Sequence, residues 1–397
     1  MFVNSDTSAL LDDIRHALDS VQDPEIHRPI TELGMVKDLT VDDQGVVSLT
    51  VLLTVAGCPL KNTIEADVQQ AIRSVDGVSD VILTMSAMSD EQRAELATRL
   101  RGGQPAPVIP FAQPGNLTHV ISIASGKGGV GKSSITVNLA LALAAQGKKV
   151  GLLDADIYGH SVPDLLGMSD DDRPTMVDSM IMPVPVSFEK ADGTKVTLKV
   201  ISMGMLKESR DQVIAWRGPI LDRALTQLLS EVFWGDLDVF LIDLPPGTGD
   251  VAMSIGQKLP GSDMIVVTTP QPNVAWVAER AGTMGSMMNQ RVIGVVENMS
   301  WLERPCPNCS AHHRIELFGS GGGKQTAQGL SERLGTSVEL LAQIPMDEAM
   351  SCESVDQPPV VIAHPDHPCA QAINALAQRL IASRPSLAGQ SLNLTTH

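Results

Sequence analysis

Apolar residues in the first 95 positions follow two different spacings. Residues 7–21, "TSALLDDIRHALDSV", and residues 58–75, "CPLKNTIEADVQQAIRSV", place them at helical intervals. Three shorter apolar stretches, "GMVKDLTV", "VVSLTVLLT" and "VSDVILTM", are typical of strands, and a "DDQG" turn joins the first two. The pattern predicts a small α+β unit over residues 1–95.

The apolar pattern stops after this unit. Residues 100–117, "LRGGQPAPVIPFAQPGNL", contain four prolines and three glycines. This composition favours an extended chain over a helix or strand. We therefore expect a linker over residues 96–117, and a flexible tail over residues 386–397.

Residues 118–385 have a third pattern. "HVISIAS", "KKVGLLDAD", "VFLIDLPPG", "DMIVVTTP" and "RVIGVVENM" are short, β-branched apolar runs without polar alternation. Such runs indicate strands covered on both faces, as in parallel sheets. Helical stretches near 219–232, 273–289, 323–335 and 367–383 would supply the cover. The predicted fold is α/β, with a doubly wound, mostly parallel sheet.

The first of these strands leads directly into "GKGGVGKS", which matches the phosphate-binding pattern G-x-x-x-x-G-K-[ST] between a strand and a helix. Glycines allow backbone N–H groups to surround phosphate oxygens, and the helix N-terminus adds positive potential. We expect Lys132 to reach the β- and γ-phosphates and Ser133 to bind Mg²⁺. The residues expected around the nucleotide are Gly126, Lys127, Gly128, Gly129, Val130, Gly131, Lys132, Ser133 and Ser134.

Polar residues follow three further strands of the predicted sheet. Asp154 and Asp156 come after "KKVGLL", where a carboxylate can position an attacking water or hold the water shell of the metal; we assign the catalytic role to Asp156. Asp243 ends "VFLID" and fits a carboxylate that binds Mg²⁺ through water. Gly247 follows in a loop suited to sensing the γ-phosphate. Asn298 ends "RVIGVVEN", and its amide is suited to pairing with an adenine edge.

Composition and charge limit the possible partners and the cellular compartment. A formal net charge of −17 repels the phosphate backbone, which argues against nucleic-acid partners. The longest apolar runs fall short of the roughly 18 residues of a membrane span, and the acidic N-terminus differs from a basic export signal. Five cysteines are too few for a disulfide framework, so we expect a reducing, cytoplasmic compartment. Cys352 and Cys369 lack partner spacing and are interpreted as structural.

The segment "ERPCPNCSAHH" contains a CxxC pair, Cys306 and Cys309. Two thiolates are half the ligand set of a tetrahedral zinc ion or an iron–sulfur cluster. Three hypotheses remain: a bound iron–sulfur cluster, a zinc site completed by His312 and His313, and a redox pair. Cys58 opens the second predicted helix, where it is either a reactive or cluster-binding thiolate or a buried structural cysteine.

These motifs together resemble the Mrp/ApbC family of iron–sulfur cluster carriers. The matching segments in the large unit are "SGKGGVGKSS", "DADIYGHS", "WRGP", "WGDLDVFLIDLPPGTGD", "TTPQ", "ENMS", "CPNC" and "QIPMD". In the small unit, "DPEI", "LGMVKDL" and "GCP" are similar to a domain fused to many bacterial members. One departure is His160, which stands where the family usually has proline.

The resemblance implies a slow ATP hydrolase that binds clusters and transfers them to apo-proteins, with nucleotide binding and hydrolysis acting as a conformational switch. In the wider deviant Walker A group, the lysine at the position of Lys127 reaches the nucleotide of the partner subunit. Family members form homodimers, so Cys306 and Cys309 of two subunits would supply four thiolates to a bridging [4Fe–4S] cluster. Implied partners are apo iron–sulfur proteins and cluster scaffold proteins.

Two alternative functions remain at this stage. One is a MinD/ParA-like positioning ATPase, which would need a membrane-binding amphipathic tail or a basic DNA-binding face. The tail "SLAGQSLNLTTH" carries no basic lysine or arginine, and the chain is acidic. The other is a zinc-binding regulatory NTPase, which differs only in the metal.

Overall fold

The computed structural model describes residues 5–23, 28–53, 61–89, 91–92, 95–96, 107–157, 159–177, 180–206, 218–306, 309, 312–350 and 357–383. The chain divides into two compact units, residues 1–106 and residues 107–397. Each unit is described by itself below.

The first unit is a three-stranded sheet with two helices. Its described elements are α1 (Ser5–Leu18), β1 (Val36–Val41), β2 (Val46–Leu53), α2 (Lys61–Arg73) and β3 (Asp80–Ala87). The strand order is β1-β2-β3; β1 runs antiparallel to β2, and β2 runs parallel to β3. The core forms where the apolar stripes of both helices meet the buried face of β2, as the sequence pattern predicts. It includes Ile14, Leu18, Val47, Leu49, Val51, Ile64, Val68 and Ile72.

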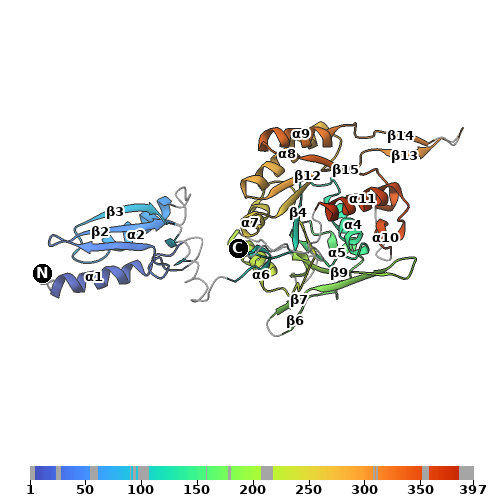
Figure 1. The fold of residues 1–397 in the computed structure, drawn as a ribbon. Coiled ribbons are helices and arrows are strands. Elements are labelled where there is room, and N and C mark those ends of the chain that lie inside the picture. The colour runs from blue at the N-terminus through green and yellow to red at the C-terminus, as the bar shows by residue number, and fades with distance from the viewer. Residues whose placement is uncertain are drawn as a thin grey trace, which may run out of the picture. The chain divides into compact units, whose positions relative to one another are not determined.

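The second unit is built on an eight-stranded sheet of described residues, in the order β15-β12-β11-β4-β10-β5-β9-β8 (Figure 1). Every adjacent pair is parallel except β8 and β9. Its strands are β4 (His119–Ser125), β5 (Val150–Asp154), β8 (Val184–Glu189), β9 (Lys195–Ser202), β10 (Val239–Asp243), β11 (Asp263–Thr268), β12 (Arg291–Glu297) and β15 (Glu339–Gln343). Two small hairpins add β6 (Thr175–Val177) with β7 (Met180–Met182), and β13 (Leu302–Pro305) with β14 (His312–Ile315).

Helices cover both faces of this sheet. Along β10, Val239 and Leu241 enter one apolar core while Phe240 and Ile242 enter the other, because successive side chains of a strand point to opposite faces. On the first face lie α4 (Lys132–Ala145), α10 (Val360–Ala363) and α11 (Pro368–Ala382), and on the second lie α6 (Gly218–Ser230), α7 (Asp250–Lys258), α8 (Pro272–Met287) and α9 (Gly322–Leu334). Shorter elements are α5 (Val162–Leu165), η1 (Pro110–Ala112), η2 (Met203–Leu206) and η3 (Glu348–Met350).

The doubly wound, mostly parallel fold is confirmed, with differences at its margins. Strands β8 and β9 were not predicted, because "VPVSFE" and "KVTLKV" alternate apolar and polar residues, unlike the continuous apolar runs of the central strands; β8 is the edge strand and β9 lies next to it. The expected linker 96–117 also differs in its second half: η1 packs on the second unit, where Phe111 stacks on Phe240 with ring centroids 4.4 Å apart. Among the described helices, none has the length and apolar character needed to span a bilayer.

Candidate functional site: a phosphate loop and a cysteine hairpin

The phosphate loop joins the end of β4 to the start of α4. Gly126 lies against α8, where a Cβ atom at this position would stand 2.4 Å from the carbonyl carbon of Val277. Gly131, with φ of +80°, precedes Lys132, the first residue of α4. The loop therefore needs glycine at these two positions, one for close packing and one for a left-handed backbone.

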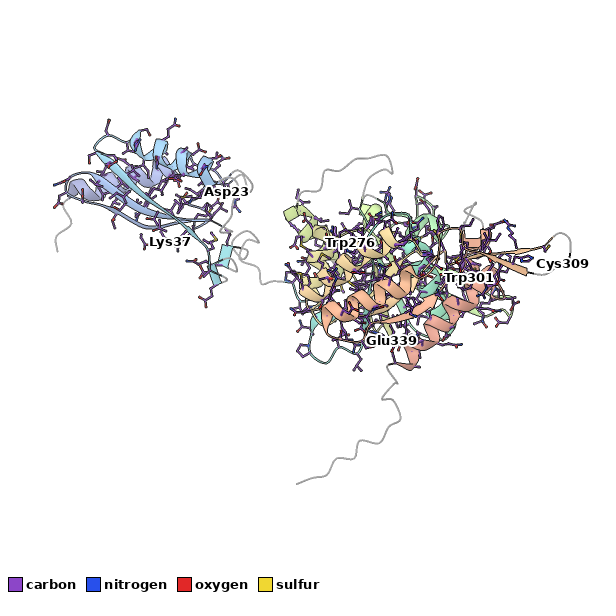
Figure 2. All side chains as sticks on the ribbon, turned by 90° about the horizontal axis from the view of Figure 1, so that it is seen from above. Asp23, Lys37, Trp276, Trp301, Cys309 and Glu339 are labelled. Carbon is purple, nitrogen blue, oxygen red and sulfur yellow. The ribbon has the colours of Figure 1, made fainter. Side chains whose placement is uncertain are left out.

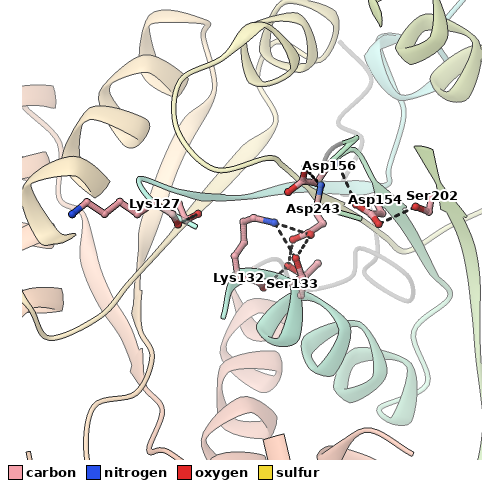
Figure 3. A network of polar contacts seen from close by, with 10 residues as sticks. Lys127, Lys132, Ser133, Asp154, Asp156, Ser202 and Asp243 are labelled. Atoms are coloured by element: carbon pink, nitrogen blue, oxygen red, sulfur yellow. Dashed lines mark hydrogen bonds and ion pairs between the residues drawn. The ribbon is translucent and has the colours of Figure 1, made fainter. Parts of the chain in front are cut away.

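The polar centre of the site lies around Asp243, at the end of β10 (Figure 3). The Lys132 Nζ atom lies 2.7 Å from Asp243 Oδ2, and the Ser133 hydroxyl donates a hydrogen bond of 2.6 Å to the same oxygen. Thr136, one turn further along α4, donates to Oδ1 at 2.7 Å. The structure thus brings together the predicted Lys132, Ser133 and Asp243. Sequence reasoning missed Thr136, although its spacing of four residues from Lys132 places both on one face of α4.

A second carboxylate lies on the neighbouring strand. Asp154 of β5 is in register with Asp243 on one side and with Ser202 of β9 on the other. It accepts hydrogen bonds from the Ser202 hydroxyl at 2.9 Å and from the backbone N–H of Asp156 at 3.1 Å. Burial, together with the nearby Asp243 carboxylate, raises the pKa of Asp154 to about 7. Ser202 was missed because it ends β9, a strand that the sequence pattern did not reveal.

Asp156 and Gly247 lie in the loops that follow β5 and β10, close to Asp154 and Asp243 in the sequence. The Asp156 carboxylate is buried and accepts a hydrogen bond from the N–H of Gly159 at 2.9 Å. Gly247, with φ of +87°, donates its N–H to the carbonyl of Ser125 at 2.8 Å, so the loop after β10 is tied to the start of the phosphate loop. His160 is half-buried and packs against Gly204, where a Cβ atom would collide with its ring.

Lys127 and Asn298, which were predicted to contact the nucleotide, are not part of the polar cluster around Asp243. Lys127 is exposed, and Figure 3 shows its side chain directed away from Lys132 and Asp243. Asn298 is buried, and its amide donates a hydrogen bond of 2.9 Å to the carbonyl of Val130. The missing side chain at Gly131 leaves the space that this amide occupies. The structure therefore gives Asn298 a supporting role in the loop.

The cysteine pair lies on the β13–β14 hairpin, which projects from the second unit with Cys309 at its outer end (Figure 2). The metal-binding atoms of Cys306, Cys309 and His313 all lie within 4.8 Å of one another. Cys306 is half-buried, and Cys309 and His313 are exposed. His313 thus joins the CxxC pair. The predicted Cys58, like Cys352, lies outside the described residues.

The base of the hairpin is attached to the body of the unit. Arg314 places its guanidinium 4.2 Å from the ring centroid of Trp301, and Arg304 forms an ion pair with Glu348 of η3. The N–H of Met346 donates to the carbonyl of Trp301 at 2.7 Å. These contacts fix where the hairpin leaves the second unit.

Comparison with known proteins decides the family. The family model described as NUBPL iron-transfer P-loop NTPase matches residues 116–381, and a model described as iron–sulfur cluster assembly protein matches residues 11–82. The chain belongs to the NUBPL iron-transfer P-loop NTPase family. The resemblance to iron–sulfur cluster carriers is thereby confirmed, and the first unit carries the assembly-protein match.

Relatives of full length carry a consistent name. The "Iron-sulfur cluster carrier protein" of Mycobacterium bovis is 49% identical over 381 residues, which cover 96% of each chain. The protein of the same name from Deinococcus radiodurans is 38% identical over 369 residues, covering 93% of this chain and 94% of that one. Among solved structures, a nucleotide-binding protein from Archaeoglobus fulgidus in complex with ADP is 31% identical over 70% of this chain and 94% of that chain, with a TM-score of 0.46.

Proposed function

We propose that this protein is an ATP-hydrolysing carrier that binds iron–sulfur clusters and delivers them to apo-proteins. The observation that carries the proposal is the cysteine pair, half-buried Cys306 and exposed Cys309, on a projecting hairpin of a chain that belongs to an iron-transfer family. An exposed site with few protein ligands suits a cargo that must be released. Cluster scaffold proteins as donors and apo iron–sulfur proteins as recipients follow from this role. Metal-binding thiols must stay reduced, which supports a cytoplasmic location.

The phosphate loop fits ATP and Mg²⁺. Residues 128–131 lead into α4, which begins at Lys132, and N–H groups at a helix start lack intrahelical acceptors and favour anions. Lys132, which is buried with the Asp243 carboxylate, would bind the β- and γ-phosphates, while Ser133 and Asp243 would hold the metal. When bound, Mg-ATP supplies a phosphoanhydride whose γ-phosphate is open to water attack.

Asp154, at the end of β5, and Asp156, in the loop that follows, differ in how well each could position the water that attacks ATP. Asp154 is fully buried, both of its oxygens accept hydrogen bonds, and its pKa of about 7 leaves much of it protonated near neutrality. Asp156 lies in the loop after β5 and, although buried, keeps more exposure than Asp154, at 7% against 0%. We therefore assign the positioning of the attacking water to Asp156, and we assign Asp154 to holding the backbone of that loop.

A short segment connects the phosphate loop to the cysteine hairpin. Asn298 holds the carbonyl of Val130, and β13 begins four residues later, at Leu302. Met299 and Phe318, which flank the hairpin in sequence, line a pocket of about 230 Å³ together with Lys127 and Val130. A nucleotide that moves the phosphate loop would therefore act on both ends of the hairpin, which is the coupling that a nucleotide-driven carrier needs.

The cluster itself would be shared. In a twofold dimer through the nucleotide face, two hairpins bring four thiolates together, which is the complete cysteine ligand set of a [4Fe–4S] cluster. The same arrangement would place Lys127, which points outward from its own site, against the nucleotide of the partner subunit.

Anaerobic reconstitution with iron and sulfide tests the function. We expect the wild-type chain to gain the visible absorption of an iron–sulfur cluster, and Cys306→Ala and Cys309→Ala to lose it while retaining ATP binding. The matched control is Cys369→Ser, because Cys369 is buried in α11 and is not part of the hairpin, and burial raises the pKa of its thiol to about 12. Equal iron and sulfide content in Cys306→Ala and the control would contradict the proposal.

A further inference from the structure

The hairpin of one chain holds three metal-binding side chains, where the proposed shared cluster uses two. Cys306 follows β13, Cys309 lies in the turn, and His313 is the second residue of β14. All three come from a segment of eight residues. Among the described side chains, His313 is the histidine that lies with the cysteine pair.

The spacing of the three groups suits one metal ion. Ligand atoms bonded about 2.3 Å from a single tetrahedral ion lie about 3.8 Å apart. The three atoms here lie within 4.8 Å of one another, so a shift of about 1 Å would bring them onto one ion. Sulfurs that bind different irons of a cluster stand farther apart, since an iron–iron separation lies between them.

We infer that each chain, by itself, binds one divalent transition-metal ion of the iron(II) or zinc class through Cys306, Cys309 and His313. The site deepens the proposed function, because it describes the hairpin of a single chain before two hairpins share a cluster. The inference rests on the proposed function only for the identity of what the hairpin carries. Mixed thiolate and imidazole ligands favour this class of metal over Mg²⁺ or Ca²⁺. Three protein ligands leave a fourth position open, as in sites whose metal meets an incoming ligand, whereas structural zinc sites are closed by four.

The surroundings of the site are consistent with this role. Arg304 lies directly opposite His313 across the hairpin, and Arg314 follows it in β14. Cysteines bind metals as thiolates, and these two cations lie on the same hairpin as that negative charge. Ion pairs to Glu348 and Glu303 hold the two arginines at the base of the hairpin, below the turn that contains Cys309.

Cobalt(II) titration of the reduced, nucleotide-free, full-length chain tests the inference, because tetrahedral cobalt reports its ligands by visible bands and by sulfur-to-cobalt charge transfer. We expect one cobalt per chain, with charge-transfer intensity for two thiolates. His313→Ala should weaken binding by at least about tenfold and change the visible bands, since losing a ligand costs at least as much as losing its supporting contacts. The matched control is His312→Ala, the same change one residue away, which should bind like wild type.

Two results would overturn the inference. One is equal cobalt affinity and an unchanged spectrum in His313→Ala and His312→Ala. The other is one cobalt per two chains with charge-transfer intensity for four thiolates, which describes a site between subunits. Both leave the carrier function standing, because that function is judged by cluster content in the cysteine variants. Conversely, cobalt binding through His313 without any cluster after reconstitution would support the metal site and refute the carrier function.

Discussion

Lys127 is the residue whose role depends most on a second subunit. It is exposed and directed away from its own Lys132, so a role in its own site is not suggested by its position. We expect Lys127→Ala to keep ATP binding and lose hydrolysis, because a cation supplied in trans stabilises transition-state charge and is worth a factor of about 10³ or more in favourable cases.

A mixed dimer separates trans from cis action. When Lys127→Ala chains are combined with Asp156→Ala chains, the site on the Lys127→Ala chain keeps its Asp156 and receives the partner's Lys127. ATPase activity should rise above that of either variant alone. If subunit exchange is shown to occur and activity stays at the level of the separate variants, Lys127 acts in cis or only shapes the loop.

The buried Asp154 predicts a pH dependence of stability. Its pKa is raised from 3.8 to about 7, so the folded chain binds a proton that the unfolded chain releases. The contribution to stability is therefore fully present below about pH 4 and is lost as the pH rises through about 7. Asp154→Asn removes this titration. In denaturant unfolding without nucleotide, the variant should gain stability relative to wild type between pH 5 and pH 8, and a constant difference across that range would contradict the assignment.

At the scale of elements, one carboxylate joins three strands at the end of the sheet opposite the phosphate loop. Asp263 of β11 accepts two hydrogen bonds from Arg291 of β12, at 2.8 and 2.9 Å, and lies 2.7 Å from Nε2 of His119 of β4. Burial alone would raise the pKa of Asp263, but the bonds from His119 and Arg291 outweigh it and hold the pKa below its usual value. This contribution to stability is present at neutral pH and is lost on acidification.

We expect Asp263→Asn to lower the free energy of unfolding of the P-loop unit by about 1.5–3 kcal/mol at pH 7, the range for hydrogen bonds to a charged group. The control is Glu339→Gln, which removes an exposed partner of Arg379 and should cost less than about 1 kcal/mol. Urea unfolding measures both. A similar loss of unfolding free energy in both variants would show that burial of the Asp263 cluster adds no stability.

At the scale of the whole molecule, the shared cluster predicts a link between cargo and assembly. Two cysteines per chain leave a [4Fe–4S] cluster short of ligands, so the reconstituted protein should be a dimer with about four irons and four sulfides per two chains. Light scattering with iron and sulfide analysis on the same anaerobic fraction checks this. A monomer that retains one cluster per chain would show that the four thiolates do not come from two hairpins.

Several elements of this protein are determined by their local sequence, and these elements could be predicted from it. Strands β4, β10, β11 and β12 are buried on both faces, so each is a continuous apolar run, and the phosphate loop has its own glycine pattern between a strand and a helix. The predicted helix at 273–289 matches α8 (Pro272–Met287) within two residues, because its apolar stripe ends where its cover of the sheet ends.

What only the tertiary structure decided depends on neighbours distant in the chain. Ser202 reaches Asp154 only because β9 lies beside β5, and the alternating apolar and polar residues of β9 did not reveal it as a strand of the parallel sheet. Asn298 lies 168 positions from the carbonyl that it holds, so this contact cannot be read from its own segment. The hairpin brings the ligand atoms of Cys306, Cys309 and His313 to within 4.8 Å of one another, while sequence spacing alone admits both histidines. Local patterns specify which faces are buried, whereas strand order and turn geometry determine which polar side chains meet.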